Sequence, residues 1–151
     1  MKKSATSPRP KKGPATKNAS PPVSEKIPGI AFPIIGIGAS AGGLEAFEQF
    51  FRAMPADSGM AFVLVPHLDP DHASMLSEIL QRNTTMPVLE VRDQTPVSPD
   101  HVYIIPPNRD MAIFHGVLQL STAERTHGQR LPIDSFFRSL AEDQGERSIC
   151  V

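Results

Sequence analysis

An alternation of short apolar runs with amphipathic helical patterns most constrains how this chain can fold. Residues 32–38 and 60–65 are apolar and rich in β-branched side chains, as buried parallel strands are. Apolar residues recur on one helical face after each run, over residues 44–51 and over residues 71–80. This strand–helix–strand–helix order predicts a parallel sheet with helices packed on its faces.

The later part of the chain adds shorter elements. We expect strands at residues 88–91 and 148–151 and a third helix over residues 131–141. Apolar runs at residues 101–105 and 111–114 flank the turn PPNRD, which predicts a β-hairpin that residues 117–120 continue. The predicted fold class is α/β: a doubly wound, mostly parallel, Rossmann-like three-layer α/β/α sheet with an inserted β-hairpin.

Composition divides the chain into a basic tail and one domain. Seven of the 15 Lys and Arg residues lie within the first 26 residues, in a segment rich in Pro, Ser and Ala. Such a segment buries too little apolar surface to offset its ordering entropy, so residues 1–31 are expected to be a disordered tail. The tail either is attracted to an acidic partner or membrane surface or is a solvated leader segment with no specific role. The sequence favours the solvated segment. Residues 32–151 are expected to form one domain.

The sequence also predicts a cytoplasmic location without membrane insertion. Cys150 is the single cysteine, so no disulfide framework can form, which fits a reducing compartment. No apolar run follows the basic start as a secretory signal requires, and no stretch is long and apolar enough to cross a bilayer. A nucleic-acid partner is not expected.

A glycine-rich turn joins the first predicted strand to the first helix, and two functions compete for it. Residues 36–43 read GIGASAGG. As Gly-x-Ser-x-Gly the turn matches a nucleophile elbow, which lifts Ser40 above the sheet edge at a helix N-terminus. As Gly-x-Gly-x-x-Ala the same residues match a dinucleotide-binding fingerprint, and a turn that only packs helix against strand is a third possibility.

His67 favours the nucleophile elbow. It follows the second predicted strand as Ser40 follows the first, whereas a dinucleotide site would place an acidic residue there. Neighbouring parallel strands lie about 5 Å apart, so side chains from their ends would share one crevice. An imidazole in that crevice can accept the serine hydroxyl proton.

The remaining candidate ligands and charges receive simpler interpretations. Asp69, Asp71 and His72 near His67 resemble a metal cluster, but a helix-capping turn explains them better, and no metal or cofactor is predicted. Arg109 in the PPNRD turn either reaches the crevice and meets an acidic segment of a protein partner or is a solvated turn charge. The sequence favours the solvated charge.

The motifs IGASAGGLEA at residues 37–46 and VPHL at residues 65–68 resemble the catalytic domain of CheB-type protein-glutamate methylesterases. VYIIPP at residues 102–107 and LPIDSFF at residues 131–137 are similar to further segments of that family. The resemblance implies a serine hydrolase that demethylates glutamate methyl esters on methyl-accepting chemotaxis receptors in bacterial two-component signalling. It also implies glutamine deamidation, with Ser40 as nucleophile and His67 as base.

The chain departs from the family pattern in three ways. Ala41 replaces the usual Thr after the nucleophile, and Pro66 replaces the usual Gln before the histidine. The family's catalytic aspartate follows the strand that begins at residue 148, so we expect a domain truncated at its C-terminal end, with missing strands and weak activity by itself. The lack of a receiver domain in front of the esterase resembles larger proteins in which the esterase is fused to a CheR-type methyltransferase. The alternatives to an esterase are a dinucleotide-binding module and a catalytically dead interaction fragment.

Overall fold

The computed structural model describes residues 30–40, 43–67, 70–122 and 131–151, without the side chains of residues 70–74. Nearly all of the predicted basic tail lies outside these residues. The elements follow the order β1 Ile34–Ala39, α1 Gly43–Ala53, β2 Ala61–Pro66, α2 Pro70–Gln81, β3 Val88–Glu90, β4 Thr95–Pro96, β5 Val102–Ile104, β6 Arg109–Phe114, β7 Val117–Thr122, α3 Pro132–Gln144, the 3-10 turn Gly145–Arg147 and β8 Ser148–Cys150. No helix in the described part of the chain is both long and apolar enough to span a bilayer.

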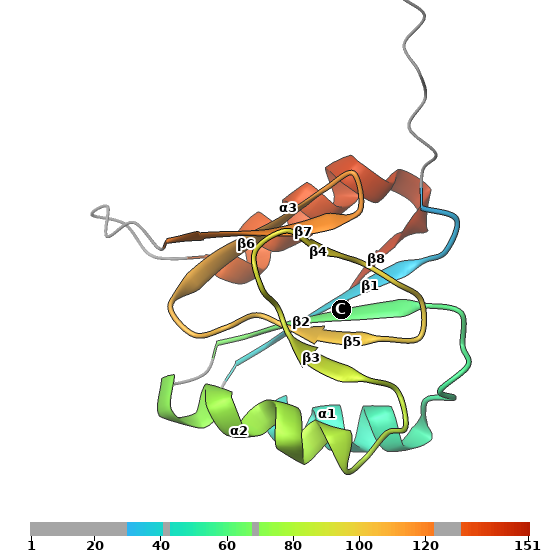
Figure 1. Ribbon diagram of the computed structural model, residues 1–151, viewed down its shortest axis with the longest axis vertical. Coiled ribbons are helices and arrows are strands. Elements are labelled where there is room, and N and C mark those ends of the chain that lie inside the picture. The colour runs from blue at the N-terminus through green and yellow to red at the C-terminus, as the bar shows by residue number, and fades with distance from the viewer. Residues whose placement is uncertain (1–29, 41–42, 68–69, 123–130) are drawn as a thin grey trace, which may run out of the picture.

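The predicted α/β architecture is confirmed. In the described part of the chain, five parallel strands form the central sheet in the order β3-β5-β2-β1-β8, and three further strands form a small antiparallel sheet in the order β4-β7-β6. Helices α1 and α2 cover one face of the central sheet, and α3 with the small sheet covers the other (Figure 1). Strands β1 and β2 therefore lie inside the molecule, which explains their nearly continuous apolar sequence.

The face toward α1 and α2 is closed by aromatic side chains. Phe51 from α1 and Phe62 from β2 are fully buried, with ring centroids 5.5 Å apart in an edge-to-face arrangement. Phe50 contacts both rings in the same geometry. Burial of one such side chain stabilises a fold by about 1.5–3 kcal/mol, so this cluster anchors α1 on the sheet.

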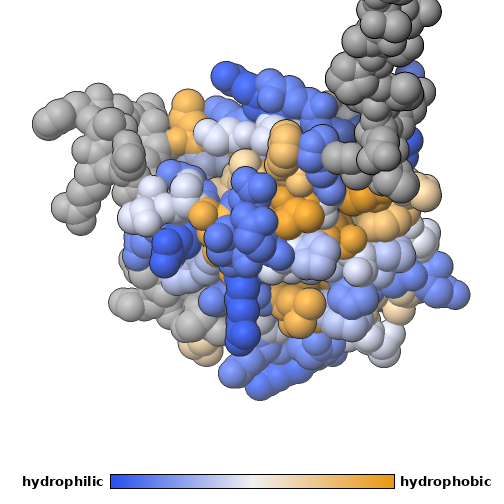
Figure 2. All heavy atoms as spheres, turned by 45° about the horizontal axis from the view of Figure 1, so that its top comes forward, coloured by the Kyte–Doolittle hydropathy of each residue, from blue (hydrophilic) through white to orange (hydrophobic). Residues whose placement is uncertain are grey.

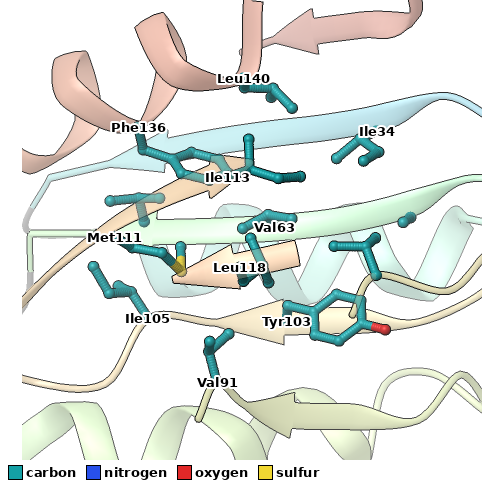
Figure 3. Close-up of a cluster of buried hydrophobic side chains, with 13 residues drawn as sticks. Ile34, Val63, Val91, Tyr103, Ile105, Met111, Ile113, Leu118, Phe136 and Leu140 are labelled. Atoms are coloured by element: carbon teal, nitrogen blue, oxygen red, sulfur yellow. The ribbon is translucent and has the colours of Figure 1, made fainter. Parts of the chain in front are cut away.

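A second cluster fills the space between the central sheet, the small sheet and α3. Val63 of the central sheet, Met111 and Leu118 of the small sheet and Phe136 of α3 converge there (Figure 3). Tyr103 lies in the same cluster, where its hydroxyl accepts a hydrogen bond of 2.9 Å from the Ser98 amide. This core fixes the position of α3 and of the small sheet above the main sheet.

The structure contains a β-hairpin in the predicted region, but the prediction was wrong about one of the two strands that form it. Residues 101–105 do not pair with residues 111–114, because β5 is a parallel strand between β2 and β3 in the central sheet. The hairpin is formed by β6 and β7, which pair from Arg109 opposite Thr122 to Phe114 opposite Val117. The turn PPNRD therefore leads from the central sheet up to the small sheet instead of closing a hairpin.

Among the described residues, strand β8 lies at one edge of the central sheet, where its pairing partner is β1. Its hydrogen bonds continue to Val151, whose N–H donates to the Gly36 carbonyl at 2.9 Å. Ile149 is 47% exposed and Val151 is 68% exposed. Figure 2 shows a face on which hydrophobic residues reach the surface in patches among hydrophilic ones.

Candidate active site

The two predicted catalytic residues follow neighbouring strands of the central sheet. β1 and β2 are parallel, with Ala39 opposite Pro66 at the end of the ladder. The His67 N–H then donates a hydrogen bond of 2.6 Å to the Ala39 carbonyl, which extends the pairing by one step. Ser40 and His67 are thus brought side by side at the carboxyl edge of the sheet, and both are exposed.

Strand alternation assigns these two residues to the same face of the sheet. In β1 the positions of Gly36 and Gly38 face α3, since a Cβ at either glycine would meet side chains of that helix. In β2 the corresponding face carries Val63 and Val65, which belong to the cluster beneath α3. Ser40 and His67 each come one residue after the strand end, so continued alternation predicts that they lie on the side of the sheet that carries α3 and the small sheet.

The chain reverses sharply after Ser40. The Gly43 N–H donates to the Ser40 carbonyl at 3.1 Å, which closes a turn immediately before α1. A Cβ at Gly43 would collide with the Cβ of Ala39, so only glycine fits where the helix starts this close to the strand. The turn places Ser40 next to the N-terminus of α1, where unpaired N–H groups and the helix dipole favour negative charge.

The first turn of α3 packs against β1 two residues before Ser40. Ile133 approaches β1 so closely that a Cβ at Gly38 would lie 2.6 Å from its Cγ2. Leu131, just before the helix, is 52% exposed. The side chains that α3 brings to this end of β1 are therefore apolar.

The turn after β5 starts beside the end of β2, on the side away from β1. The Ile105 N–H donates to the Leu64 carbonyl at 3.1 Å, so β5 ends beside the end of β2. The chain then passes through Pro106 and Pro107 to Asn108, which adopts a positive φ of 56°. β6 begins at the next residue, Arg109, which is exposed. His67 thus lies between this turn and Ser40.

The other histidines and acids considered as metal ligands do not form a cluster within the described residues. His101 Nδ1 lies 2.7 Å from the Pro99 carbonyl, and the His115 backbone N–H donates to Asp143. Asp69 and His127 lie outside the described residues, and so do the side chains of Asp71 and His72. Within the described ranges, no group of three His, Cys, Asp or Glu side chains is placed to hold a metal ion.

The sequence did not predict which later segments lie near Ser40 and His67. The motifs mark these two residues, but they do not show that the first turn of α3 and the turn after β5 lie close to the ends of β1 and β2. The glycines at positions 36 and 38 carried a usable signal, because glycine inside a buried strand often marks a close approach of another element. That element is α3.

Comparison with known proteins agrees with this architecture. Residues 35–151 match the family described as CheB methylesterase. The catalytic domain of the CheB methylesterase from Thermotoga maritima, a solved structure, superposes with a TM-score of 0.71 at 22% identity, covering 80% of this chain and 66% of that one. This likeness shows that the fold is shared.

Curated relatives from bacteria and archaea are similar over the same region. "Protein-glutamate methylesterase/protein-glutamine glutaminase 2" of Pseudomonas aeruginosa is 32% identical over 116 residues, which cover 74% of this chain and 33% of that protein. The protein of the same name from Methanosarcina acetivorans is 31% identical over 124 residues, which cover 77% of this chain and 35% of that protein. The chain thus spans about a third of the length of these relatives. Its sequence match and its fold together show that the chain belongs to the CheB methylesterase family.

Proposed function

We propose that this chain carries the nucleophile and the general base of an esterase that hydrolyses glutamate methyl esters on proteins. Ser40 is the nucleophile and His67 is the base. The observation that supports this most directly is the hydrogen bond from the His67 N–H to the Ala39 carbonyl, because it brings the two residues together at one edge of the sheet. Their family membership supplies the class of reaction.

The reaction follows from the chemistry of the two side chains. The Ser40 hydroxyl oxygen attacks the ester carbonyl carbon while His67 accepts the hydroxyl proton. The tetrahedral intermediate then collapses, and His67 returns the proton to the departing methanol. Water, deprotonated by His67, hydrolyses the acyl-enzyme and releases the glutamate side chain and Ser40. With glutamine as substrate, ammonia takes the place of methanol.

The N-terminus of α1 supports the charged intermediate. Oxyanion stabilisation requires N–H donors aimed at the position where negative charge develops. Helix α1 begins at Gly43, three residues after Ser40, which supports a role for the positive end of its dipole in stabilising the oxyanion. The base and the oxyanion donors therefore come from different elements that meet at Ser40.

The family supports a proposal for the substrate and the cellular setting. Relatives are named for action on glutamate and glutamine of proteins. We propose methyl-accepting chemotaxis receptors in the cytoplasm as the substrate of this chain, with a CheR-type methyltransferase domain acting on the same receptors. Receptor methylation and demethylation then set the signalling state.

Labelling with a fluorophosphonate probe tests the nucleophile. We expect the wild-type chain to be labelled at Ser40, because the probe reacts with a serine whose neighbouring base accepts its proton. Ser40→Ala is expected to abolish labelling, and His67→Gln to slow it by about three orders of magnitude or more. Mass spectrometry of the labelled peptide identifies the modified residue.

Ser135→Ala is the matched control, since Ser135 is an exposed serine on α3 that follows no strand. It should leave labelling unchanged. Labelling that persists in Ser40→Ala would contradict the proposal. A chain that resists the probe but binds NAD or NADP saturably would instead be a dinucleotide-binding module.

A further inference from the structure

A hollow of about 420 Å³ lies between the C-terminal ends of α1 and α2, lined by residues 51, 52, 54, 56 and 81–85. Helix α1 connects the parallel strands β1 and β2, so it runs from the carboxyl edge of the sheet back to the amino edge. It starts at Gly43, near Ser40, and its 11 residues end at Ala53 beside the hollow. The hollow therefore lies at the opposite edge of the sheet from the candidate active site.

The inner side of the hollow is apolar. Phe51 is buried there, and the partly buried Met54 and Ala56 pack against the same core cluster. These side chains belong to the core that holds α1 on the sheet. An apolar group that enters the hollow would thus lose its contact with water against a fixed surface.

Hydrogen bonds fix the polar side of the hollow. Arg52 Nη2 donates to Asn83 Oδ1 at 2.9 Å, and Asn83 Nδ2 donates to the Glu48 carboxylate at 3.2 Å. Gln81 Nε2 donates to the Thr84 carbonyl at 3.1 Å, which ties down the turn after α2. The rim is therefore arranged before a ligand binds, which reduces the entropy that binding would cost.

The charged side chains of the lining are both cationic. Among the described residues that line the hollow, Arg52 and Arg82 carry positive charge and none carries negative charge. The negative ends of the α1 and α2 dipoles offset part of this charge, since each amounts to about half an elementary charge. Arginine presents its N–H donors in a planar fork that matches a carboxylate. The hollow thus combines an apolar inner side with a rim suited to one carboxylate.

We propose that this hollow binds a small organic acid, whose carboxylate contacts the two arginines and whose apolar body packs on the inner side. Small-molecule sites in proteins have volumes of roughly 300–1,000 Å³ and few, well-placed polar groups, as here. The site does not depend on the esterase chemistry, because Ser40 and His67 lie at the other edge of the sheet.

Titration of the full chain with phenylacetate, followed by amide NMR spectra, tests the site. We expect a dissociation constant on the order of 1 mM, with shifts concentrated at the residues that line the hollow. Phenylacetamide keeps the ring but lacks the charge, so it should bind about threefold to fivefold more weakly, as an exposed ion pair allows. Acetate keeps the charge but lacks the ring, so it should bind at least about tenfold more weakly.

Arg82→Gln removes one charge from an exposed side chain and should weaken phenylacetate binding about threefold. Ala56→Leu fills part of the inner side and should weaken the binding of phenylacetate and phenylacetamide alike. Arg92→Gln is the matched control, because Arg92 is an exposed arginine just after β3 that does not line the hollow. This control should bind phenylacetate as the wild-type chain does.

Two results would overturn the inference. One is an equal affinity for phenylacetate in Arg82→Gln and in the wild-type chain. The other is a set of shifts centred on Ser40 and His67, which would assign the acid to the candidate active site. Fluorophosphonate labelling of the same samples reports the esterase separately, so either proposal can fail while the other stands.

Discussion

Two glycines in β1 decide how closely α3 can lie against the sheet. A Cβ at Gly36 would lie 2.9 Å from Leu140, and a Cβ at Gly38 would lie 2.6 Å from Ile133. Distances this short force neighbouring groups to move. The absence of side chains at the two glycines therefore allows α3 to pack closely on β1 near Ser40. Both glycines also belong to the glycine-rich segment that joins β1 to α1.

Gly38→Ala is expected to destabilise the chain by about 1–3 kcal/mol, because the added methyl overpacks the contact with Ile133. Urea unfolding measures the change. Ile133→Ala removes the colliding side chain, so the double variant should lose less stability than the two single variants together. Strictly additive losses would show that Ile133 does not limit the space at Gly38.

Much of the candidate site was predictable at this scale, and the reason is local. Ser40 and His67 each follow an apolar strand directly, so the sequence places both at strand ends, and the expected neighbourhood of β1 and β2 is confirmed. Their catalytic roles stay a prediction. The position of Arg109 could not be predicted, because it depends on the pairing of β6 with β7 and on the path of the turn before it.

At the scale of elements, the strand pairing of β5 and β6 could not be predicted from local sequence patterns. The two segments were expected to pair with each other, but β5 pairs with β2 and β3, and β6 pairs with β7. Residues 101–105 and 111–114 lie on either side of a turn, so local reasoning paired them. β5 instead completes the central sheet between β2 and β3, which is a long-range choice driven by burial on both faces. β4 contains only Thr95 and Pro96, too few residues to give any periodic signal.

Asp143 of α3 accepts hydrogen bonds from the turn of the β6–β7 hairpin. Its two carboxylate oxygens accept hydrogen bonds from the His115 N–H at 2.6 Å and from the Gly116 N–H at 2.9 Å. Both turn residues have positive φ angles. The turn thus depends on the helix for satisfaction of its backbone donors.

Asp143→Ala should lower the free energy of unfolding by about 1–3 kcal/mol, since it leaves two backbone donors without their acceptors. Chemical denaturation measures this loss. Glu142→Ala is the matched control: Glu142 is an exposed acid on the same helix, and its removal should change stability by less than about 0.5 kcal/mol. Equal losses in the two variants would contradict a stabilising role for the hydrogen bonds that Asp143 accepts.

At the scale of the whole molecule, β1 and β2 belong to both cores. Ile34 and Val63 face the cluster beneath α3, whereas Ile35 and Phe62 face the cluster above α1 and α2. Neither layer can separate from the sheet without exposing one of these clusters. The two strands that directly precede Ser40 and His67 thus contribute side chains to both cores.

The bond between the His67 amide and the Ala39 carbonyl continues the sheet ladder by one step and holds the backbones beside the two proposed catalytic residues together. Sub-global opening usually begins in loops and frayed ends, which fluctuate well below the unfolding temperature. Since Ser40 and His67 directly follow two paired strands of the central sheet, we expect labelling by the fluorophosphonate probe and the cooperative fold to disappear together on heating.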